Sequence, residues 1–227
     1  MQLIRAEKRD KCESAGFQTR FATANTLIGD PDTPEILVAD FNRVDCFTLI
    51  DYVEALTHSN DQKSFLQNLV RIRYTGGHVD YLHRRHFFSD WFATAPRNAR
   101  DIPPYISPDY IVVDKQLNRK QDGGEYIPGL GIHLRKINYI PGKAINQKVV
   151  NHLNDGDYVG IYSPLDGLDV SHVGIVVRHD GQVWFRNTSS LTGNRKVMDS
   201  PFLEYMRTKP GIVVLRAGSQ PVTGAME

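Results

Sequence analysis

Cys46 is the residue whose type and position best suit nucleophilic chemistry. A thiol attacks as its thiolate, so its pKa must fall from about 8.5 toward the working pH. The first turn of a helix favours that change, because its unpaired N–H groups and its dipole stabilise negative charge. Apolar residues recur at helical spacing across residues 44–56, with Asn42 or Asp45 as the capping residue. The pattern therefore predicts Cys46 in a first turn, although a buried structural cysteine would also fit a helix.

A histidine that could move the proton lies in a hairpin around Asp180-Gly181. This dipeptide favours a two-residue type I′ turn. Counting the register back from such a turn places Gly174 opposite Asn187 and His172 opposite Ser189. Alternate strand residues share a face, so His172 and Asn187 point the same way as diagonal neighbours. Gly174 would leave room for Asn187 to lean toward the imidazole, and a three-residue loop would break this facing.

These three side chains together could carry out nucleophilic catalysis. We expect Cys46 to attack a carbonyl, His172 to move the proton and Asn187 to orient the imidazole. No cofactor is expected. Considered singly, His172 could be an ordinary strand histidine, and Asn187 a polar residue at the end of a strand. Their joint placement is what favours a catalytic role.

The elements that must position these residues are helices first and strands afterwards. A second helix is predicted near residue 60, where Ser59 and Gln62 resemble a capping box, and residues 79–92 are expected to be helical too. Beyond Pro96, glycines and prolines separate short β-prone stretches. This order predicts an α+β fold, with the helices packed on one face of an antiparallel sheet. Strands are predicted at 110–113, 132–140, 157–163, 170–178, 182–188 and 212–215.

Composition limits the class of protein. Of the 227 residues, 41% are apolar, enough for one large domain. We expect a single domain over 1–227, with a helical part at about 35–95, an irregular insertion at about 96–145 and a sheet part at about 146–217. The 27 basic and 26 acidic residues are mixed along the chain, so no nucleic-acid partner is expected. The apolar runs are far too short to cross a membrane, so no integral membrane segment is expected either.

The cysteines and the first residues bear on the compartment. Two cysteines, Cys12 and Cys46, argue against a disulfide framework and leave one bridge between them open. The charged residues 1–9 lack the apolar core of a secretory signal. The protein therefore either stays in the cytoplasm or begins after a signal has been removed.

A second cluster competes for the role of functional site. His83, His86 and Asp90 would share one face of a helix and could bind zinc. Their spacing matches no familiar zinc motif, so a solvated basic edge is the simpler alternative. We favour instead a substrate-binding rim, in which Arg84 or Arg85 meets a carboxylate.

Several short motifs resemble one known family. Asp45-Cys-Phe-Thr-Leu-Ile-Asp51 resembles the Asp-Cys-x-Thr-x-x-acid motif of the N-acetylmuramoyl-L-alanine amidase-like family. That family is part of the NlpC-type branch of papain-like cysteine hydrolases. Arg84-Arg-His-Phe-Phe-Ser-Asp-Trp91 is similar to its arginine–histidine–aromatic segment. The likeness spans roughly residues 35–216 and includes 154–157, 171–174 and 211–216.

The resemblance implies a papain-like α+β fold, in which the helix of Cys46 packs on an antiparallel sheet. It implies a bacterial enzyme that acts on cell-wall peptidoglycan or muropeptide fragments. The Cys46 thiolate would cleave the amide between N-acetylmuramic acid and L-alanine, with Arg84, His86 and Trp91 binding the substrate. A place in the periplasm or cell envelope is expected from the resemblance alone, and we expect a monomer.

The chain departs from the family pattern at two points. The family often has histidine where this chain has Asn187, although papain-like enzymes accept asparagine in the orienting role. The superfamily often has a tyrosine upstream of the nucleophile, near the oxyanion hole. The nearest residues here are Phe41 and Asn42, which leaves that hydrogen-bond donor unassigned.

Three other functions stay open at the level of sequence. The same three residues would serve an endopeptidase that cuts within the stem peptide. A catalytically inactive cell-wall-binding module would keep the fold and lose the reactive thiol. A zinc hydrolase would be built on His83 and His86.

Overall fold

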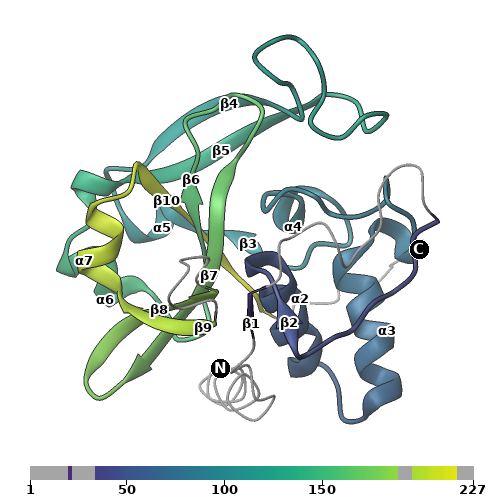
Figure 1. Cartoon of the computed structure of the whole chain (residues 1–227). Helices are drawn as coiled ribbons and strands as arrows, with labels where there is room; N and C mark the ends of the chain where they lie inside the picture. Colours follow the sequence, from purple (N-terminus) through teal and green to yellow (C-terminus); the bar gives the residue numbers. More distant parts are fainter. Residues whose placement is uncertain (1–19, 22–33, 189–195, 219–227) are drawn as a thin grey trace, which may run out of the picture.

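An antiparallel sheet forms the centre of the computed structural model, which describes residues 20–21, 34–188 and 196–218 (Figure 1). Seven of its eight strands follow the order β4-β5-β10-β6-β7-β8-β9, and β3 pairs with β10 beside this path. The strands are β3 (Arg100–Asp101), β4 (Ile111–Leu117), β5 (His133–Pro141), β6 (Tyr158–Tyr162), β7 (Val170–His179), β8 (Gln182–Thr188), β9 (Val197–Pro201) and β10 (Gly211–Arg216). A two-residue parallel pair joins β1 (Arg20–Phe21) to β2 (Arg43–Val44).

The helices are mostly short, apart from two near the start of the described chain. They are α2 (Cys46–Thr57), α3 (Gln62–Arg73), α4 (Asp90–Ala93), α5 (Pro103–Ile106), α6 (Gln147–His152) and α7 (Phe202–Arg207), with 3-10 turns η1 (Thr75–Gly77) and η2 (Gly142–Ala144). Within the described residues, no helix combines the length and the apolar character needed to cross a membrane.

Side-chain caps fix where the two long helices begin. Asp45 caps α2, because its carboxylate accepts a hydrogen bond from the Thr48 N–H at 2.6 Å. Cys46 is therefore the first residue of α2, as predicted. At α3, the expected capping box is wrong by two residues, since Asp61 and Ser64 make the reciprocal pair.

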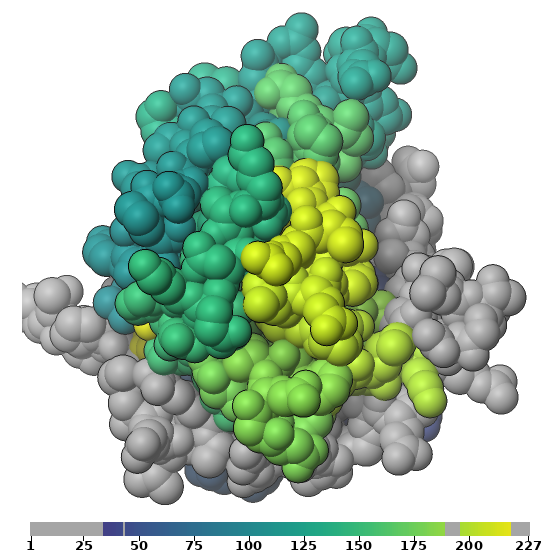
Figure 2. Space-filling model, turned by 90° about the vertical axis from the view of Figure 1, so that its left-hand side faces the viewer, coloured from purple at the N-terminus to yellow at the C-terminus, as the bar shows by residue number. Residues whose placement is uncertain are grey.

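Helices cover both faces of the sheet. On one face, α2 and α3 share a core with Val173 and Ile175 of β7. On the other face, Val176 of β7 packs with Val149 of α6 and Phe202 of α7. Figure 2 views the molecule from this second side, with the yellow segment around α7 at the surface. The expected packing on one face is wrong, because short helices that lack a long apolar period cover the second face.

The hairpin of β7 and β8 has the predicted register. Asp180 and Gly181 both have positive φ, 50° and 71°, as a type I′ turn requires. The pairs that follow include Gly174 with Asn187, which confirms the count made from the turn. The expected partner of His172, Ser189, lies outside the described residues.

Two other predictions about the fold differ from the structure. Residues 79–92 form turns and only the start of α4, because local side-chain bonds compete with a helix. The Asp80 carboxylate accepts from the Leu82 N–H, and the Arg85 guanidinium donates to the carbonyls of Asp90, Thr94 and Pro96. The region expected as an irregular insertion is part of the sheet, because the strands predicted there at 110–113 and 132–140 are confirmed as β4 and β5, which pair along their length at one edge.

The close packing at Gly174 generates a stability prediction. A Cβ atom there would lie 2.5 Å from the Arg186 carbonyl oxygen and 2.6 Å from the Phe185 ring. The space beside Gly174 is therefore filled by the ring of Phe185. The sequence had suggested that Asn187 would use this space, and that expectation is wrong. We expect Gly174→Ala to lower the free energy of unfolding by about 1–3 kcal/mol, measured by urea titration. Gly218→Ala is the control, because no described atom beyond its chain neighbours lies within 4 Å of a Cβ built there. Equal stability of the two variants would contradict this account.

Candidate active site

The Cys46 sulfur lies at the meeting point of α2 and β7. The backbone N–H groups of Cys46 and Phe47, in the first turn of α2, and of Val173 on β7 act to lower the pKa of this thiol. The Val173 side chain packs beneath α2. The same strand residue therefore contacts the helix through its side chain and acts on the thiol through its backbone N–H. Three N–H groups are thus available to negative charge at this position.

His172, next to Val173 on β7, has its imidazole held by Asn187 of β8. The imidazole Nε2 lies 3.1 Å from the Asn187 Oδ1. The amide orientation is fixed on its other side, since the Asn187 Nδ2 donates to the Phe185 carbonyl at 3.0 Å. Asn187 can therefore only accept from the imidazole, which makes Nε2 the protonated nitrogen and leaves the Nδ1 lone pair free. The tautomer is the one a general base needs.

The structure joins His172 to Asn187, while the thiol and the imidazole are not hydrogen-bonded to each other in the described part of the chain. Among the hydrogen bonds of the described residues, none joins the Cys46 sulfur to His172. Val173 connects the two elements, since it follows His172 on β7 and packs in the same core as α2. A proton transfer between them needs the imidazole to approach the sulfur.

Burial dominates the protonation of both groups. It raises the pKa of the Cys46 thiol to about 12, with the negative charge of Asp45 adding to the rise. It also lowers the pKa of His172 below its ordinary value, although the bond to Asn187 opposes that shift. The expected lowering of the thiol pKa by the helix start is thus wrong for the free protein, because loss of hydration outweighs the N–H groups. Both groups are neutral at neutral pH.

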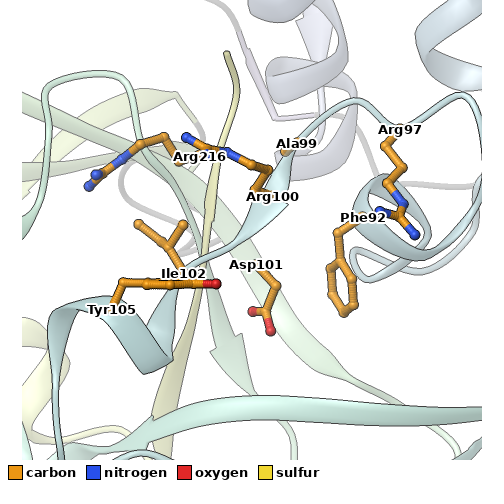
Figure 3. A pocket seen from close by; sticks show the side chains of 8 residues that line it. All are labelled: Phe92, Arg97, Ala99, Arg100, Asp101, Ile102, Tyr105 and Arg216. Atoms are coloured by element: carbon orange, nitrogen blue, oxygen red, sulfur yellow. The ribbon is translucent and has the colours of Figure 1, made fainter. Parts of the chain in front are cut away.

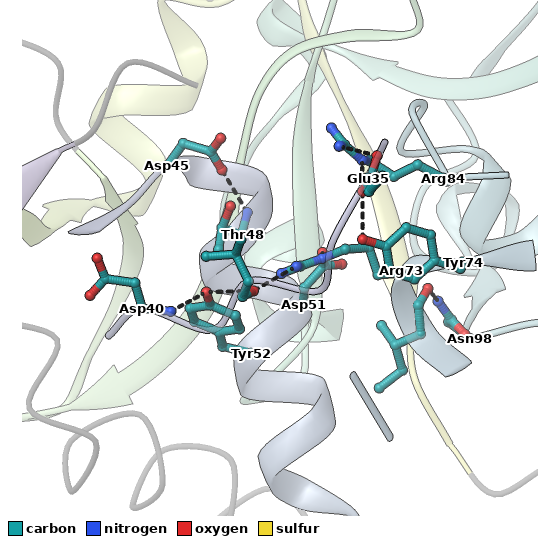
Figure 4. A network of polar contacts seen from close by, with 12 residues as sticks. Glu35, Asp40, Asp45, Thr48, Asp51, Tyr52, Arg73, Tyr74, Arg84 and Asn98 are labelled. Carbon is teal, nitrogen blue, oxygen red and sulfur yellow. Dashed lines mark hydrogen bonds and ion pairs between the residues drawn. The ribbon is translucent and has the colours of Figure 1, made fainter. Parts of the chain in front are cut away.

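Arg84, the predicted carboxylate binder, has a carboxylate partner within the chain. Its Nε and Nη2 lie 3.1 and 2.6 Å from the two oxygens of Glu35, whose side chain is 0% exposed (Figure 4). The Tyr74 hydroxyl donates to the same carboxylate. Because the Arg84 guanidinium is bound to Glu35, the prediction that Arg84 is open to a substrate carboxylate is contradicted. The neighbouring Arg85 donates to backbone carbonyls instead.

His86 and Trp91 also have structural partners. The His86 Nε2 lies 2.6 Å from the Tyr81 carbonyl oxygen. Trp91 is 0% exposed and packs edge-on against Tyr158, with ring centroids 4.9 Å apart. A side chain without exposed surface cannot touch a substrate, so the substrate-binding role predicted for Trp91 is wrong. Its apolar ring belongs to the core beneath α2.

The zinc alternative finds no support in the residues that the structure describes. They contain no group of three or more histidine, cysteine, aspartate or glutamate side chains placed to hold a metal ion. His83 pairs with Asp80 at 3.0 Å, while His86 faces a backbone carbonyl. The shared helix face on which that hypothesis depended does not form.

A buried ion pair that was not predicted from the sequence lies under α2. Asp51, one turn and a half after Cys46, accepts from the Arg73 Nε at 2.9 Å, and both side chains are almost fully buried (Figure 4). Arg73 also donates to the Val38 carbonyl at 3.0 Å. An acid within an otherwise apolar helix was the available signal, because a buried carboxylate requires a partner.

Comparison with solved structures shows the same fold in three proteins from bacteria. A protein from Legionella pneumophila is 19% identical over 94% of this chain and 89% of that chain, with a TM-score of 0.77. An N-acetylmuramoyl-L-alanine amidase from Bacteroides uniformis is 26% identical over 94% of this chain and 100% of that chain, with a TM-score of 0.74. A candidate xylanase from Bacteroides fragilis is 26% identical over 89% and 99% of the two chains, with a TM-score of 0.70.

Comparison with protein families is more decisive. No curated protein matches the chain. The model of the AmiA-like family, described as N-acetylmuramoyl-L-alanine amidase-like, matches residues 13–212. Since this match covers most of the chain, the protein belongs to the AmiA-like, N-acetylmuramoyl-L-alanine amidase-like family.

Proposed function

We propose that the protein is a cysteine-dependent peptidoglycan amidase that hydrolyses the amide between N-acetylmuramic acid and L-alanine. The proposal rests chiefly on one observation, the hydrogen bond of Asn187 that leaves His172 with a free Nδ1. Cys46 at the start of α2 supplies the nucleophile. Membership of the amidase-like family supports the choice of reaction. We also propose that the fold is of the papain-like, NlpC type.

The proposed reaction begins from two neutral groups. As the sulfur bonds to the amide carbon, its proton passes to the Nδ1 of His172. The oxyanion that forms is held by backbone N–H groups next to Cys46. The imidazolium then protonates the leaving nitrogen, the C–N bond breaks, and a thioester remains on Cys46. Water, deprotonated by His172, hydrolyses the thioester and restores both groups.

The choice of bond depends on the family and not on a substrate-binding segment. The interpretation that Arg84 and Trp91 select the muramoyl amide has lost its basis, since both are engaged within the protein. An endopeptidase acting within the stem peptide would use the same three residues. The B. uniformis relative is named an N-acetylmuramoyl-L-alanine amidase, which favours the amidase. We further propose that the protein acts in the cell envelope and that it is a monomer.

The products of digestion test both the nucleophile and the bond. Mass spectrometry of digested muropeptides should reveal free muramoyl sugar and a peptide that begins with L-alanine. Cys46→Ala should lower kcat by at least about 10⁴-fold, because no other group can form the thioester. Cys12→Ala, the matched control, should retain activity. New amino termini on diaminopimelate or lysine would make the enzyme an endopeptidase, and an active Cys46→Ala protein would refute the mechanism.

The pH profile tests whether the pair starts neutral. A base must be unprotonated, so the acid limb of kcat/KM should lie below the ordinary histidine range, as the lowered pKa of His172 requires. The thiol pKa of about 12 predicts no alkaline limb below pH 9. Activity should therefore be level between pH 7 and 9. A decline within that interval would instead indicate a preformed thiolate–imidazolium pair.

Asn187→Ala tests the orienting role. Loss of its Oδ1 frees the imidazole to rotate, so kcat should fall by about 10²-fold. The bond to Asn187 raises the pKa of His172, so its removal should also move the acid limb to lower pH. Ser200→Ala removes only a contact to Asn187 at 3.5 Å and serves as the control. A fall in kcat with an unmoved acid limb would point to general damage to the fold.

A further inference from the structure

A cavity of about 530 Å³ lies beside β3 and shares no lining residue with the Cys46 site (Figure 3). Its size falls in the range of pockets that bind small ligands. Asp101 of β3 lies between two aromatic side chains, Tyr105 of α5 and Phe92 of α4. The polar lining also includes three arginines, Arg97, Arg100 and Arg216.

Asp101 provides the negative group of the cavity. Its Oδ2 accepts from the Asn138 side chain at 2.5 Å, while its Oδ1 is buried with no hydrogen-bond partner in the described part of the chain. Burial raises the pKa of this carboxyl to about 6. The half-buried Asp101 side chain faces the cavity, and its only described hydrogen-bond partner is a neutral amide, so a ligand that brings an ammonium beside the carboxylate would stabilise its charge.

The arginines provide the positive groups. Arg216 is held by both oxygens of Asp157, at 2.7 Å each, and is not available as a bidentate partner. Arg97 and Arg100 are exposed and form no ion pair with any described residue. Two unpaired guanidinium groups at one opening favour carboxylates over neutral ligands.

Tyr105 adds an apolar surface, since its ring is 81% exposed on α5. In Figure 3 its hydroxyl end is directed toward Asp101, and the Phe92 ring lies on the other side. A ligand that packs aliphatic or ring carbons between these two side chains would place its charged ends against Asp101 and the arginines.

We propose that this cavity binds a short peptide that carries a free ammonium group and carboxylates. Asp101 would take the ammonium, Arg97 and Arg100 the carboxylates, and Tyr105 with Phe92 the carbon skeleton. The identification with stem peptide rests on the proposed function, because amidase cleavage releases a peptide of this chemistry. The cavity would then be a second peptide site, separate from the thiol.

Calorimetry on the full chain with Cys46→Ala tests the proposal without turnover. The probe is the tripeptide L-alanyl-γ-D-glutamyl-L-lysine, compared with its N-acetylated form and with N-acetylmuramic acid. We expect the free tripeptide to bind, and Asp101→Asn or the pair Arg97→Gln and Arg100→Gln to weaken it about tenfold or more. Arg71→Gln, an exposed arginine on α3, is the matched control and should bind like the parent.

The outcomes separate this site from the proposed reaction. N-acetylation should weaken binding as strongly as Asp101→Asn does, because both remove the same ion pair. Absence of tripeptide binding, binding that the variants leave unchanged, or binding of N-acetylmuramic acid alone would each overturn the proposal. If Cys46→Ala still abolishes amidase activity in that case, only the second site has failed. Urea titration of Asp101→Asn checks folding, and its stability should be equal or higher, since burial opposes the charge it removes.

Discussion

The register between β7 and β8 is the constraint on which the candidate site depends. A slip of β8 by one residue would turn His172 and Asn187 to opposite faces and would move the buried side chains of β8 to the other face of the sheet. The turn at Asp180–Gly181 fixes this register by its positive φ angles, and the ring of Phe185 packs against Gly174, where a Cβ atom would lie 2.6 Å from it. The packing of the sheet therefore determines where the Asn187 amide contacts the His172 imidazole.

Burial is the second general feature of the site. It keeps both the thiol and the imidazole neutral, and it also isolates the ion pair of Asp51 with Arg73 beneath the nucleophile helix. Such a pair contributes little net stability, because desolvation offsets its attraction. Its effect is geometric, since it ties α2 to α3 and, through Arg73, to the Val38 carbonyl. The ion pair between Asp51 and Arg73 thus fixes the position of α2, including its first turn.

Local signals in the sequence were sufficient for part of this arrangement. The placement of Cys46 in a first turn, with Asn42 or Asp45 as the cap, and the hairpin register follow from rules that involve only neighbouring residues; the structure selects Asp45. Long-range partners were not accessible in this way. No local pattern indicates that Arg84 meets Glu35, 49 positions earlier, or that Trp91 enters the core. The prediction of a lowered pKa for the Cys46 thiol was wrong for the same reason, because burial depends on the packing of the whole chain.

A neutral thiol has a consequence for the chemical lifetime of the enzyme. Peroxides and disulfides react with thiolates far faster than with thiols, so oxidation to sulfenic acid follows the population of the charged form. Cys46 keeps its proton in the resting protein and is a free cysteine. Its sulfur is then poorly reactive toward oxidants, and in the proposed reaction it becomes reactive only when a carbonyl arrives and His172 accepts the proton. The same burial that slows spontaneous ionisation would preserve the nucleophile in an oxidising environment.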